Sequence, residues 1–123
     1  MQKAILSALL LTALATSALA EGSYPVSGKW GQSPSTEKGP VDCSKLRVVE
    51  FNGEERTDSG GGVPAFRLRS IEAEGTSSYR VVDEFTTGQI SSGQAIYTLK
   101  KIDADRIELN MTPGGLLKLQ RCK

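Results

Sequence analysis

Residues 95–122 read AIYTLKKIDADRIELNMTPGGLLKLQRC, and apolar and polar side chains alternate along most of this stretch. Every second residue of 106–111 is apolar, and the turn residues 112–115 then lead into another alternating run at 116–122. A period of two indicates strands with one buried side and one solvent-facing side. The stretch therefore predicts consecutive antiparallel strands.

The same alternation recurs between turn signals along the chain, and no sustained helical period interrupts it. The predicted strands are residues 28–32, 47–52, 65–73, 79–85, 95–102, 106–111 and 116–122. Residues 54–58 could form one more, although they contain no apolar side chain. The sequence thus predicts an all-β fold, a small antiparallel barrel or sandwich meander of seven or eight short strands with one disulfide.

Residues 1–20 have the pattern of a bacterial signal peptide. Lys3 is followed by small and apolar residues, and Ala18-Leu19-Ala20 matches a cleavage site. The run is too short and too polar for a stable membrane span. We expect a periplasmic or secreted protein with a single β domain at residues 21–123.

Charge gives no reason to expect nucleic acid or anionic lipid as a partner. The 123-residue chain has 15 basic and 14 acidic residues, and the two numbers become equal when Lys3 is removed with residues 1–20. A neutral surface of mixed sign does not attract polyanions.

Cys43 and Cys122 are the only cysteines, and in an exported protein they are expected to form a disulfide. The bond would close a loop of roughly 80 residues, a constraint of about 4 kcal/mol in the chain-entropy model. The chain has no histidine, so a zinc site is not expected. We expect no metal and no cofactor.

The disulfide limits the topology. In a strict meander that includes 54–58, Cys43 and Cys122 would lie at opposite ends of the sheet, too far apart to bond. We therefore doubt the strand at 54–58, or expect one connection to cross an end of the sheet.

Two connections are candidates for a binding rim. Residues 59–64 and 86–94 are separated by one hairpin, which puts them at the same end of the sheet, beside 113–115. Long loops grouped on a rigid scaffold often bind partners, although plain flexible connectors are the alternative. The candidate partner-binding residues are Ser59, Gly61, Val63, Pro64, Thr87, Gln89, Ile90 and Ser92. Val63 and Ile90 would be the apolar anchors.

Catalytic motifs are not convincing in this sequence. Asp58-Ser59-Gly60-Gly61 is similar to the nucleophile stretch of chymotrypsin-like proteases, but no histidine is present to act as the base. Asp103 and Asp105 fit a solvated turn better than a calcium loop. The adjacent acids Asp83 and Glu84 point to opposite faces of a strand, so they cannot work as a pair.

Gly28-Lys29-Trp30, shortly after the signal peptide and followed by a β meander, is similar to the opening of lipocalins and other calycin-type barrels. Secreted inhibitors of bacterial metalloproteases share this opening, and the resemblance implies an eight-stranded barrel with one disulfide. The second cysteine departs from that family, because it lies at the C-terminus. The chain also resembles small uncharacterised exported proteins of Gram-negative bacteria, which implies no activity.

These patterns favour a non-catalytic binding module that contacts another envelope or secreted protein through its loop rim, for example as an inhibitor. A calycin-like carrier of a small apolar ligand and a structural envelope component are the alternatives. Trp30 is expected in the core, where Arg121 could stack on it across the closure between the first and last strands.

Overall fold

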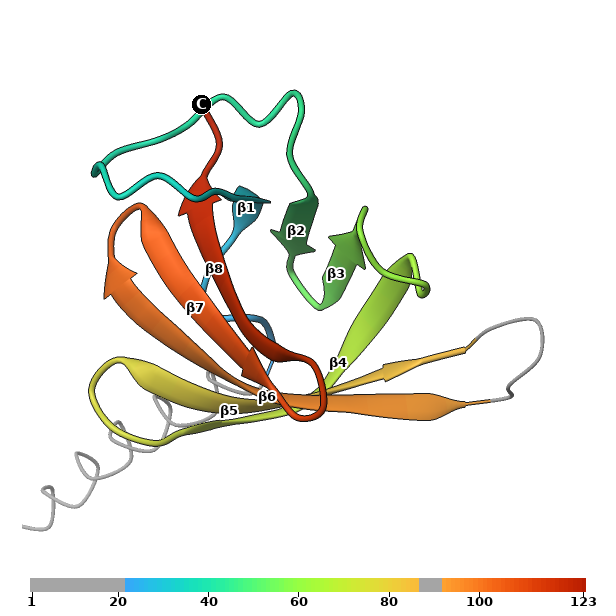
Figure 1. Cartoon of the computed structure of the whole chain (residues 1–123). Coiled ribbons are helices and arrows are strands. Elements are labelled where there is room, and N and C mark those ends of the chain that lie inside the picture. Colours follow the sequence, from blue (N-terminus) through green and yellow to red (C-terminus); the bar gives the residue numbers. More distant parts are fainter. Residues whose placement is uncertain (1–21, 87–91) are drawn as a thin grey trace, which may run out of the picture.

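The computed structural model describes residues 22–86 and 92–123 (Figure 1). The predicted signal peptide lies outside this part of the chain, as do three of the predicted rim residues, Thr87, Gln89 and Ile90. Eight strands make up the fold: β1 (Gly28–Gln32), β2 (Val48–Asn52), β3 (Glu55–Asp58), β4 (Ala65–Ala73), β5 (Ser78–Phe85), β6 (Gly93–Asp103), β7 (Arg106–Met111) and β8 (Gly115–Arg121).

The strands close into one barrel in their sequence order. Each strand is antiparallel to the next, and β8 returns to pair with β1. The predicted all-β antiparallel meander is confirmed, and the barrel is the architecture observed. Within residues 22–86 and 92–123 there is no helix long and apolar enough to cross a membrane.

Alternate side chains of the strands fill the interior, as expected for a barrel of this strand number. In β7, for example, Ile107 and Leu109 are buried while their neighbours are more exposed. The buried apolar core consists of Tyr24, Trp30, Val49, Phe51, Leu68, Val81, Tyr97, Leu99, Ile107, Leu109, Leu117 and Leu119. Burial of each large side chain contributes about 1.5–3 kcal/mol to the free energy of folding.

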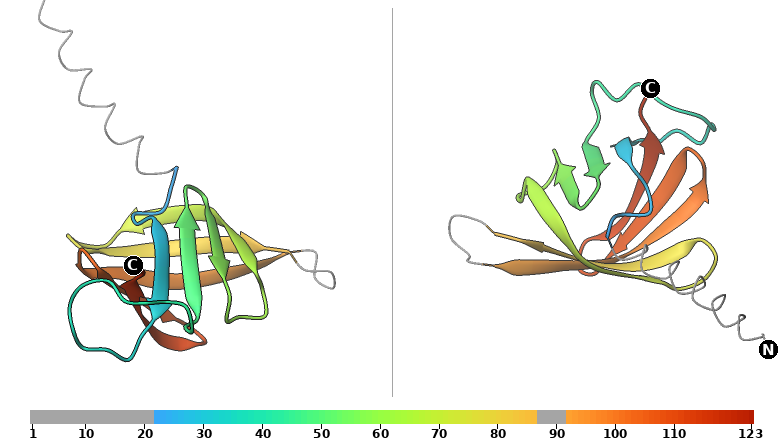
Figure 2. Two further views of the ribbon diagram at one scale, coloured as in Figure 1. Left: turned by 90° about the horizontal axis from the view of Figure 1, so that it is seen from above. Right: turned by 180° about the vertical axis from the view of Figure 1, so that it is seen from behind.

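The barrel is uneven around its circumference. The strands β4, β5 and β6 contain 9, 8 and 11 residues, whereas β1, β2 and β3 contain 5, 5 and 4. The hairpin of β5 and β6 therefore extends beyond the rest of the barrel (Figures 1 and 2). At one end of the molecule the pairing of β4 with β5 stops, while β4 continues to pair with β3 and β5 continues to pair with β6.

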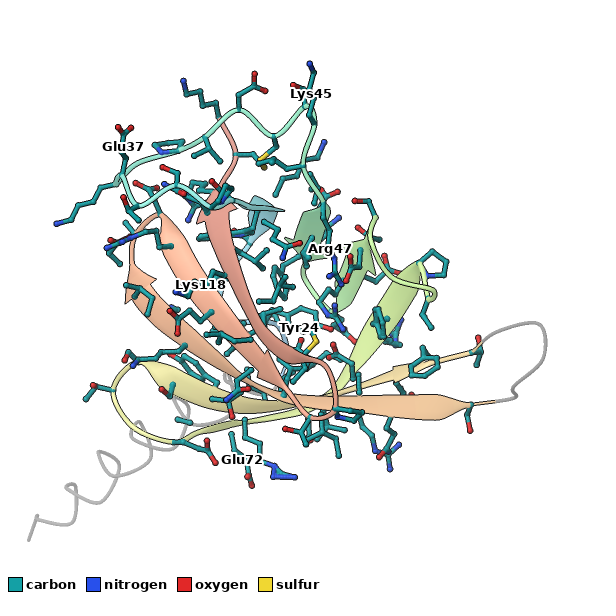
Figure 3. All side chains as sticks on the ribbon, viewed as in Figure 1. Tyr24, Glu37, Lys45, Arg47, Glu72 and Lys118 are labelled. Carbon is teal, nitrogen blue, oxygen red and sulfur yellow. A yellow bond between two sulfur atoms is a disulfide. The ribbon has the colours of Figure 1, made fainter. Side chains whose placement is uncertain are left out.

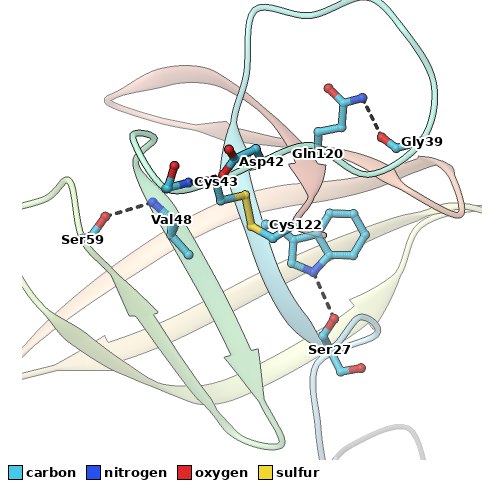
Figure 4. The surroundings of a disulfide bond; sticks show 10 residues. Ser27, Gly39, Asp42, Cys43, Val48, Ser59, Gln120 and Cys122 are labelled. Atoms are coloured by element: carbon cyan, nitrogen blue, oxygen red, sulfur yellow. Dashed lines mark hydrogen bonds between the residues drawn. A yellow bond between two sulfur atoms is a disulfide. The ribbon is translucent and has the colours of Figure 1, made fainter.

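The segment 33–47, between β1 and β2, folds back against the outside of the barrel and is bonded to the C-terminus (Figure 4). The predicted disulfide is present: Cys43 and Cys122 are joined, with their Cα atoms 5.5 Å apart. Val41 forms a parallel bridge with Cys122. A Cβ atom at Gly31 would lie 2.6 Å from the Cys43 sulfur, so only glycine lets the disulfide approach β1 this closely.

Gln120 fastens the middle of the same segment. The side chain of Gln120 lies on the outer face of β8, whereas that of its neighbour Leu119 points into the core. Gln120 is nevertheless only 3% exposed. The Gln120 amide donates hydrogen bonds to the carbonyls of Glu37 and Gly39, at 2.6 and 2.8 Å. The returning segment is therefore held by polar contacts as well as by the covalent bond.

The doubt about a strand at residues 54–58 was wrong, because β3 and the disulfide are both present. Cys43 does not begin a strand. It lies in the returning segment, before β2 starts at Val48, and this lets it reach the far end of β8. The strand lacks apolar residues because its inner face consists of Arg56 and Asp58, both buried.

The predicted contact between Trp30 and Arg121 is confirmed at the seam of β1 and β8. The two residues are directly opposite each other, and the guanidinium carbon lies 4.3 Å from the centre of the indole ring. Trp30 is 1% exposed, and its indole N–H donates to the carbonyl of Ser27 at 3.0 Å. Cation–π stacking at a buried ring contributes about 1–2 kcal/mol.

Replacement of both Cys43 and Cys122 by serine should lower the free energy of unfolding by about 2–5 kcal/mol, because the unfolded chain regains the freedom that the long loop had lost. Urea unfolding followed by the fluorescence of Trp30, the single tryptophan, measures the change. Ser44→Ala is the matched control with the disulfide intact. An unchanged unfolding midpoint in the double variant would contradict the stabilising role of the bond.

Candidate functional site

Because consecutive strands alternate in direction, β1, β3, β5 and β7 all finish at the same end of the barrel. Among the connections that leave from this end, residues 59–64 join β3 to β4 and residues 112–114 join β7 to β8, while most of the predicted rim connection after β5 lies outside the described residues. We call this the rim end, and residues 59–64 the rim loop. Of the predicted rim residues in the described part of the chain, Ser59, Gly61, Pro64 and Ser92 are exposed and Val63 is half-buried.

The base of the rim loop is fastened by backbone contacts. The Asp58 amide donates to the Pro64 carbonyl at 3.1 Å, which closes the loop on itself. Ser59 is tied to Val48 of β2 twice: its amide donates to the Val48 carbonyl, and its hydroxyl accepts from the Val48 amide at 2.9 Å (Figure 4). The loop therefore leaves the barrel in a fixed direction.

An ion pair holds the same base from the side. Arg47 donates to both carboxylate oxygens of Asp58, at 2.8 and 2.7 Å, and the Gly60 amide donates to one of them at 2.9 Å. Burial by itself would raise the pKa of Asp58, but the hydrogen bonds from Arg47 and Gly60 outweigh it, so the pKa is lowered. The Arg47 side chain passes so close to Gly60 that a Cβ atom there would overlap it.

A groove of about 710 Å³ runs along the outside of β1, β2 and β3, between the rim loop and the disulfide. Its floor includes the outward side chains of Lys29, Glu50 and Thr57. Ser59 and Pro64, two of the predicted partner-binding residues, line one side of it. The structure thus brings these two together beside a hollow large enough for a ligand or a peptide segment.

A second hollow opens where β4 and β5 part. Their pairing at the rim end stops at Arg67 and Glu84, and the cleft beyond has a volume of about 310 Å³. Phe66 and Phe85 line it and meet edge to face, with ring centres 5.5 Å apart. Ser92 lines this cleft and not the groove, so the structure does not place all predicted rim residues in one hollow.

Phe66 of this cleft also contacts a buried cluster of charges that the sequence did not predict. Asp83, which is 0% exposed, points into the barrel and accepts three hydrogen bonds. Tyr24 donates to one carboxylate oxygen at 2.7 Å, while Tyr97 and the Arg56 Nε both donate to the other at 2.8 Å. Tyr24 comes from the segment before β1 and reaches into the barrel interior (Figure 3). Four separate parts of the chain therefore meet at one carboxylate.

Both tyrosines of the cluster have a raised pKa. For Tyr24 and for Tyr97 burial is the largest cause, and the negative charge of Asp83 adds to it. A phenolate in this position would be poorly solvated and would face a carboxylate. The two hydroxyls thus remain neutral donors.

Arg56 is the remaining member of the cluster and reaches β5 from β3. Its guanidinium carbon lies 3.9 Å from the centre of the Phe66 ring and 5.1 Å from that of Tyr97. Its Nη1 atom is 3.8 Å from a carboxylate oxygen of Asp58, within ion-pair range but beyond hydrogen-bond distance. Arg56 and Asp58 are thus the polar inner face of β3.

Sequence reasoning missed these residues because it looked for apolar side chains on the inner faces. Asp83 lies between Val81 and Phe85 at a spacing of two, so its position already assigned it to the buried face. Arg56 and Asp58 show the same spacing in β3. Alternation applied to charged residues would have indicated a buried ion pair in a barrel interior.

Comparison of the chain with protein-family models, with curated proteins and with solved structures finds no match. The likeness to calycin-type barrels therefore stays a prediction. Among residues 22–86 and 92–123 no three histidine, cysteine, aspartate or glutamate residues are grouped to hold a metal ion. The oxygens of both buried aspartates are engaged by donors of the chain itself.

Gly60→Ala should destabilise the fold by about 1–3 kcal/mol, because the added methyl group displaces the Arg47 side chain from Asp58. Gly62 is the matched control: nothing lies within 4 Å of a Cβ atom placed there. Gly62→Ala should therefore change stability by less than about 0.5 kcal/mol. Thermal unfolding of the two variants measures the difference, and equal midpoints would contradict the proposed role of Gly60.

The stability of the protein should fall at alkaline pH. The raised pKa values of Tyr24 and Tyr97 mean that their contribution is complete below about pH 10, the pKa of tyrosine in unfolded chains, and is lost as the pH rises further. Each tyrosine adds a slope of about 1.4 kcal/mol per pH unit above that point.

The Tyr24→Phe variant tests this slope. The variant loses one hydrogen bond to Asp83 and should be less stable than the wild type near neutral pH, but its stability should fall less steeply as the pH rises above about 10. Urea unfolding at a series of pH values above about 10 supplies the measurement. Equal slopes for the two proteins would show that Tyr24 does not titrate with unfolding.

Proposed function

We propose that this protein is a non-catalytic binding module of the periplasm or the extracellular medium, and that it inserts its rim loop into a cleft of another envelope or secreted protein. The observation that carries the proposal is the construction of the rim loop, which has a fixed base and a tip without side chains. A secreted enzyme with a narrow active-site cleft, such as a protease or a lysozyme, is the class of partner that fits best. The protein would then act as an inhibitor.

The fixed base supports this proposal on energetic grounds. Ordering a flexible loop on binding costs conformational free energy, and a loop that is already ordered avoids much of that cost. The contacts of Asp58 with Pro64, Arg47 and Gly60 provide the ordering. A rigid projection can therefore bind more tightly than an open connector of equal length.

The tip of the rim loop is narrow enough to enter a cleft. Gly61 and Gly62 are exposed, and a side chain at Gly62 would meet no other part of the molecule. The loop thus presents bare backbone amides and carbonyls, which can approach a partner closely. Val63 beside them supplies an apolar contact, and the groove next to Ser59 and Pro64 can receive a segment that projects from the partner.

The filled interior explains why a binding module is preferred to a carrier of a large apolar ligand. The inward side chains of β1, β2, β6, β7 and β8 occupy the barrel, with Trp30, Phe51 and Leu99 among the most buried. The two hollows that flank the rim loop both open at the surface, over β1–β3 and between β4 and β5. Surface hollows beside a rigid loop suit recognition of another protein.

Gly62→Leu should weaken partner binding at least tenfold, because the added side chain widens the inserted tip, and it should leave the melting temperature within about 2 °C. The immobilised wild-type domain is first used to capture candidates from envelope and culture-medium fractions. Each candidate is then purified, and its affinity for the wild type and the variant is measured by calorimetry. A captured enzyme should also lose activity on addition of the wild-type domain.

Thr76→Leu is the matched control, since Thr76 is exposed in the turn between β4 and β5 at the opposite end of the barrel. This variant should bind the partner as the wild type does. The proposal fails if Gly62→Leu and wild type bind every purified candidate equally, or if Thr76→Leu weakens binding as much as Gly62→Leu.

A further inference from the structure

The strongest unexplained feature of the molecule is the guanidinium of Arg56. Its side chain is 1% exposed, and only Nε has an acceptor, the carboxylate of Asp83. Nη1 and Nη2 are buried and have no hydrogen-bond partner among the described residues. A buried donor without an acceptor costs about 1–3 kcal/mol, and more for a charged group, so this arrangement calls for an acceptor from outside the chain.

The neighbouring carboxylates cannot supply that acceptor. Asp83 already accepts from Tyr24, Tyr97 and Arg56 Nε. Asp58 is held in a two-point pair by Arg47, which keeps its oxygen 3.8 Å from Arg56 Nη1. The two outer nitrogens of Arg56 are thus left as a free fork.

The cleft between β4 and β5 gives access to this fork. Phe66 lines the cleft with one part of its surface and covers the guanidinium at 3.9 Å. Beyond Arg67 and Glu84 the two strands are not paired, so no backbone ladder closes the gap. Rotation of the half-buried Phe66 ring is therefore the movement required to join the cleft to Arg56.

The charges of the cluster limit the charge that a ligand can carry. Arg47 and Arg56 balance Asp58 and Asp83, so the cluster is neutral as a whole. A fork of two N–H groups matches the two oxygens of a carboxylate. A monoanion adds one buried charge to a neutral cluster, whereas a phosphate dianion adds two. The loss of hydration therefore costs more free energy for the dianion. The rings of Phe66 and Phe85 favour a ligand with an apolar body.

We propose that Arg56 anchors a binding site for a small monocarboxylate with an apolar or aromatic body, reached through the cleft between β4 and β5. The carboxylate lies on Nη1 and Nη2 of Arg56, and the apolar body lies between Phe66 and Phe85. The residues that would hold the ligand are not those of the rim loop, so either proposal can fail without the other.

Benzoate is a suitable probe, with benzyl alcohol and inorganic phosphate as comparison ligands. Benzoate should raise the melting temperature of the wild-type protein saturably, as a ligand of the folded state does, and should shift the NMR signals of the Arg56 side chain. Benzyl alcohol, which lacks the charge, and phosphate, which lacks the apolar body, should each bind at least tenfold more weakly. No saturable effect of benzoate, or an equal effect of either comparison ligand, would overturn the proposal.

Two variants and one control locate the site. Phe85→Ala should weaken benzoate binding severalfold, because it removes one of the two rings that hold the apolar body, while the control Glu72→Gln, on the exposed outer face of β4, should leave the affinity unchanged. Arg56→Gln should abolish the benzoate effect. If Arg56→Gln does not fold, the NMR signals of Arg56 in the wild type decide the question, because benzoate binding elsewhere would leave them unshifted and would overturn the assignment.

Discussion

The fold depends on one buried carboxylate. Asp83 lies in the barrel interior with no exposure, and an isolated charge there would cost far more free energy than a barrel of this size can supply. It is tolerated because Tyr24, Tyr97 and Arg56 each donate to it. These donors come from the segment before β1, from β6 and from β3, so the carboxylate also fixes how those parts are arranged around β5. A shift of β5 by one residue would place Asp83 on the outer face and leave Arg56 without its partner. Buried ion pairs often add little to stability, and we infer that this one contributes chiefly to the register of the strands.

The position of the cluster divides the barrel into two unlike halves. Around β1, β7 and β8 the interior is apolar, with Trp30, Leu109 and Leu119 in contact with the core. Around β3, β4 and β5 it contains charges, and there the strands part and the rim loop begins. A sheet region with a charged interior cannot rely on apolar packing for its shape. Specific hydrogen bonds take over that role, which is why the loop base is fastened by Asp58 and Arg47 and not by a hydrophobic contact.

The sequence predicted the strands in which buried apolar side chains alternate with exposed polar ones. Ile107 and Leu109, or Leu117 and Leu119, reveal their strands by alternation, and the pairing of Cys43 with Cys122 was expected from their number and the predicted export signal. It left the strand at residues 54–58 in doubt, because the residues that face inward in β3 are Arg56 and Asp58. Nor did it predict that segment 33–47 folds back over β1 and β8, since the contacts that hold it, such as those of Gln120 with backbone carbonyls, leave no periodic signal. The charged cluster could not be predicted either. Its residues come from four separate segments, and the spacing of residues along the chain does not show which segments meet.

Asp58 connects the two candidate sites through competition for a single carboxylate. Its oxygens are within reach of two arginines, and the pair with Arg47 at 2.7 Å leaves Arg56 Nη1 at 3.8 Å. If Asp58 turned toward Arg56, the inner fork would be filled and the base of the rim loop would lose its clamp. In the two proposals, the same clamp keeps the loop rigid for the protein partner and keeps the fork of Arg56 free for a small acceptor. An acceptor bound to Arg56 would in turn favour the pairing of Asp58 with Arg47, because it removes the competing cation. By thermodynamic linkage, a ligand in the cleft and a partner on the loop would then strengthen each other's binding.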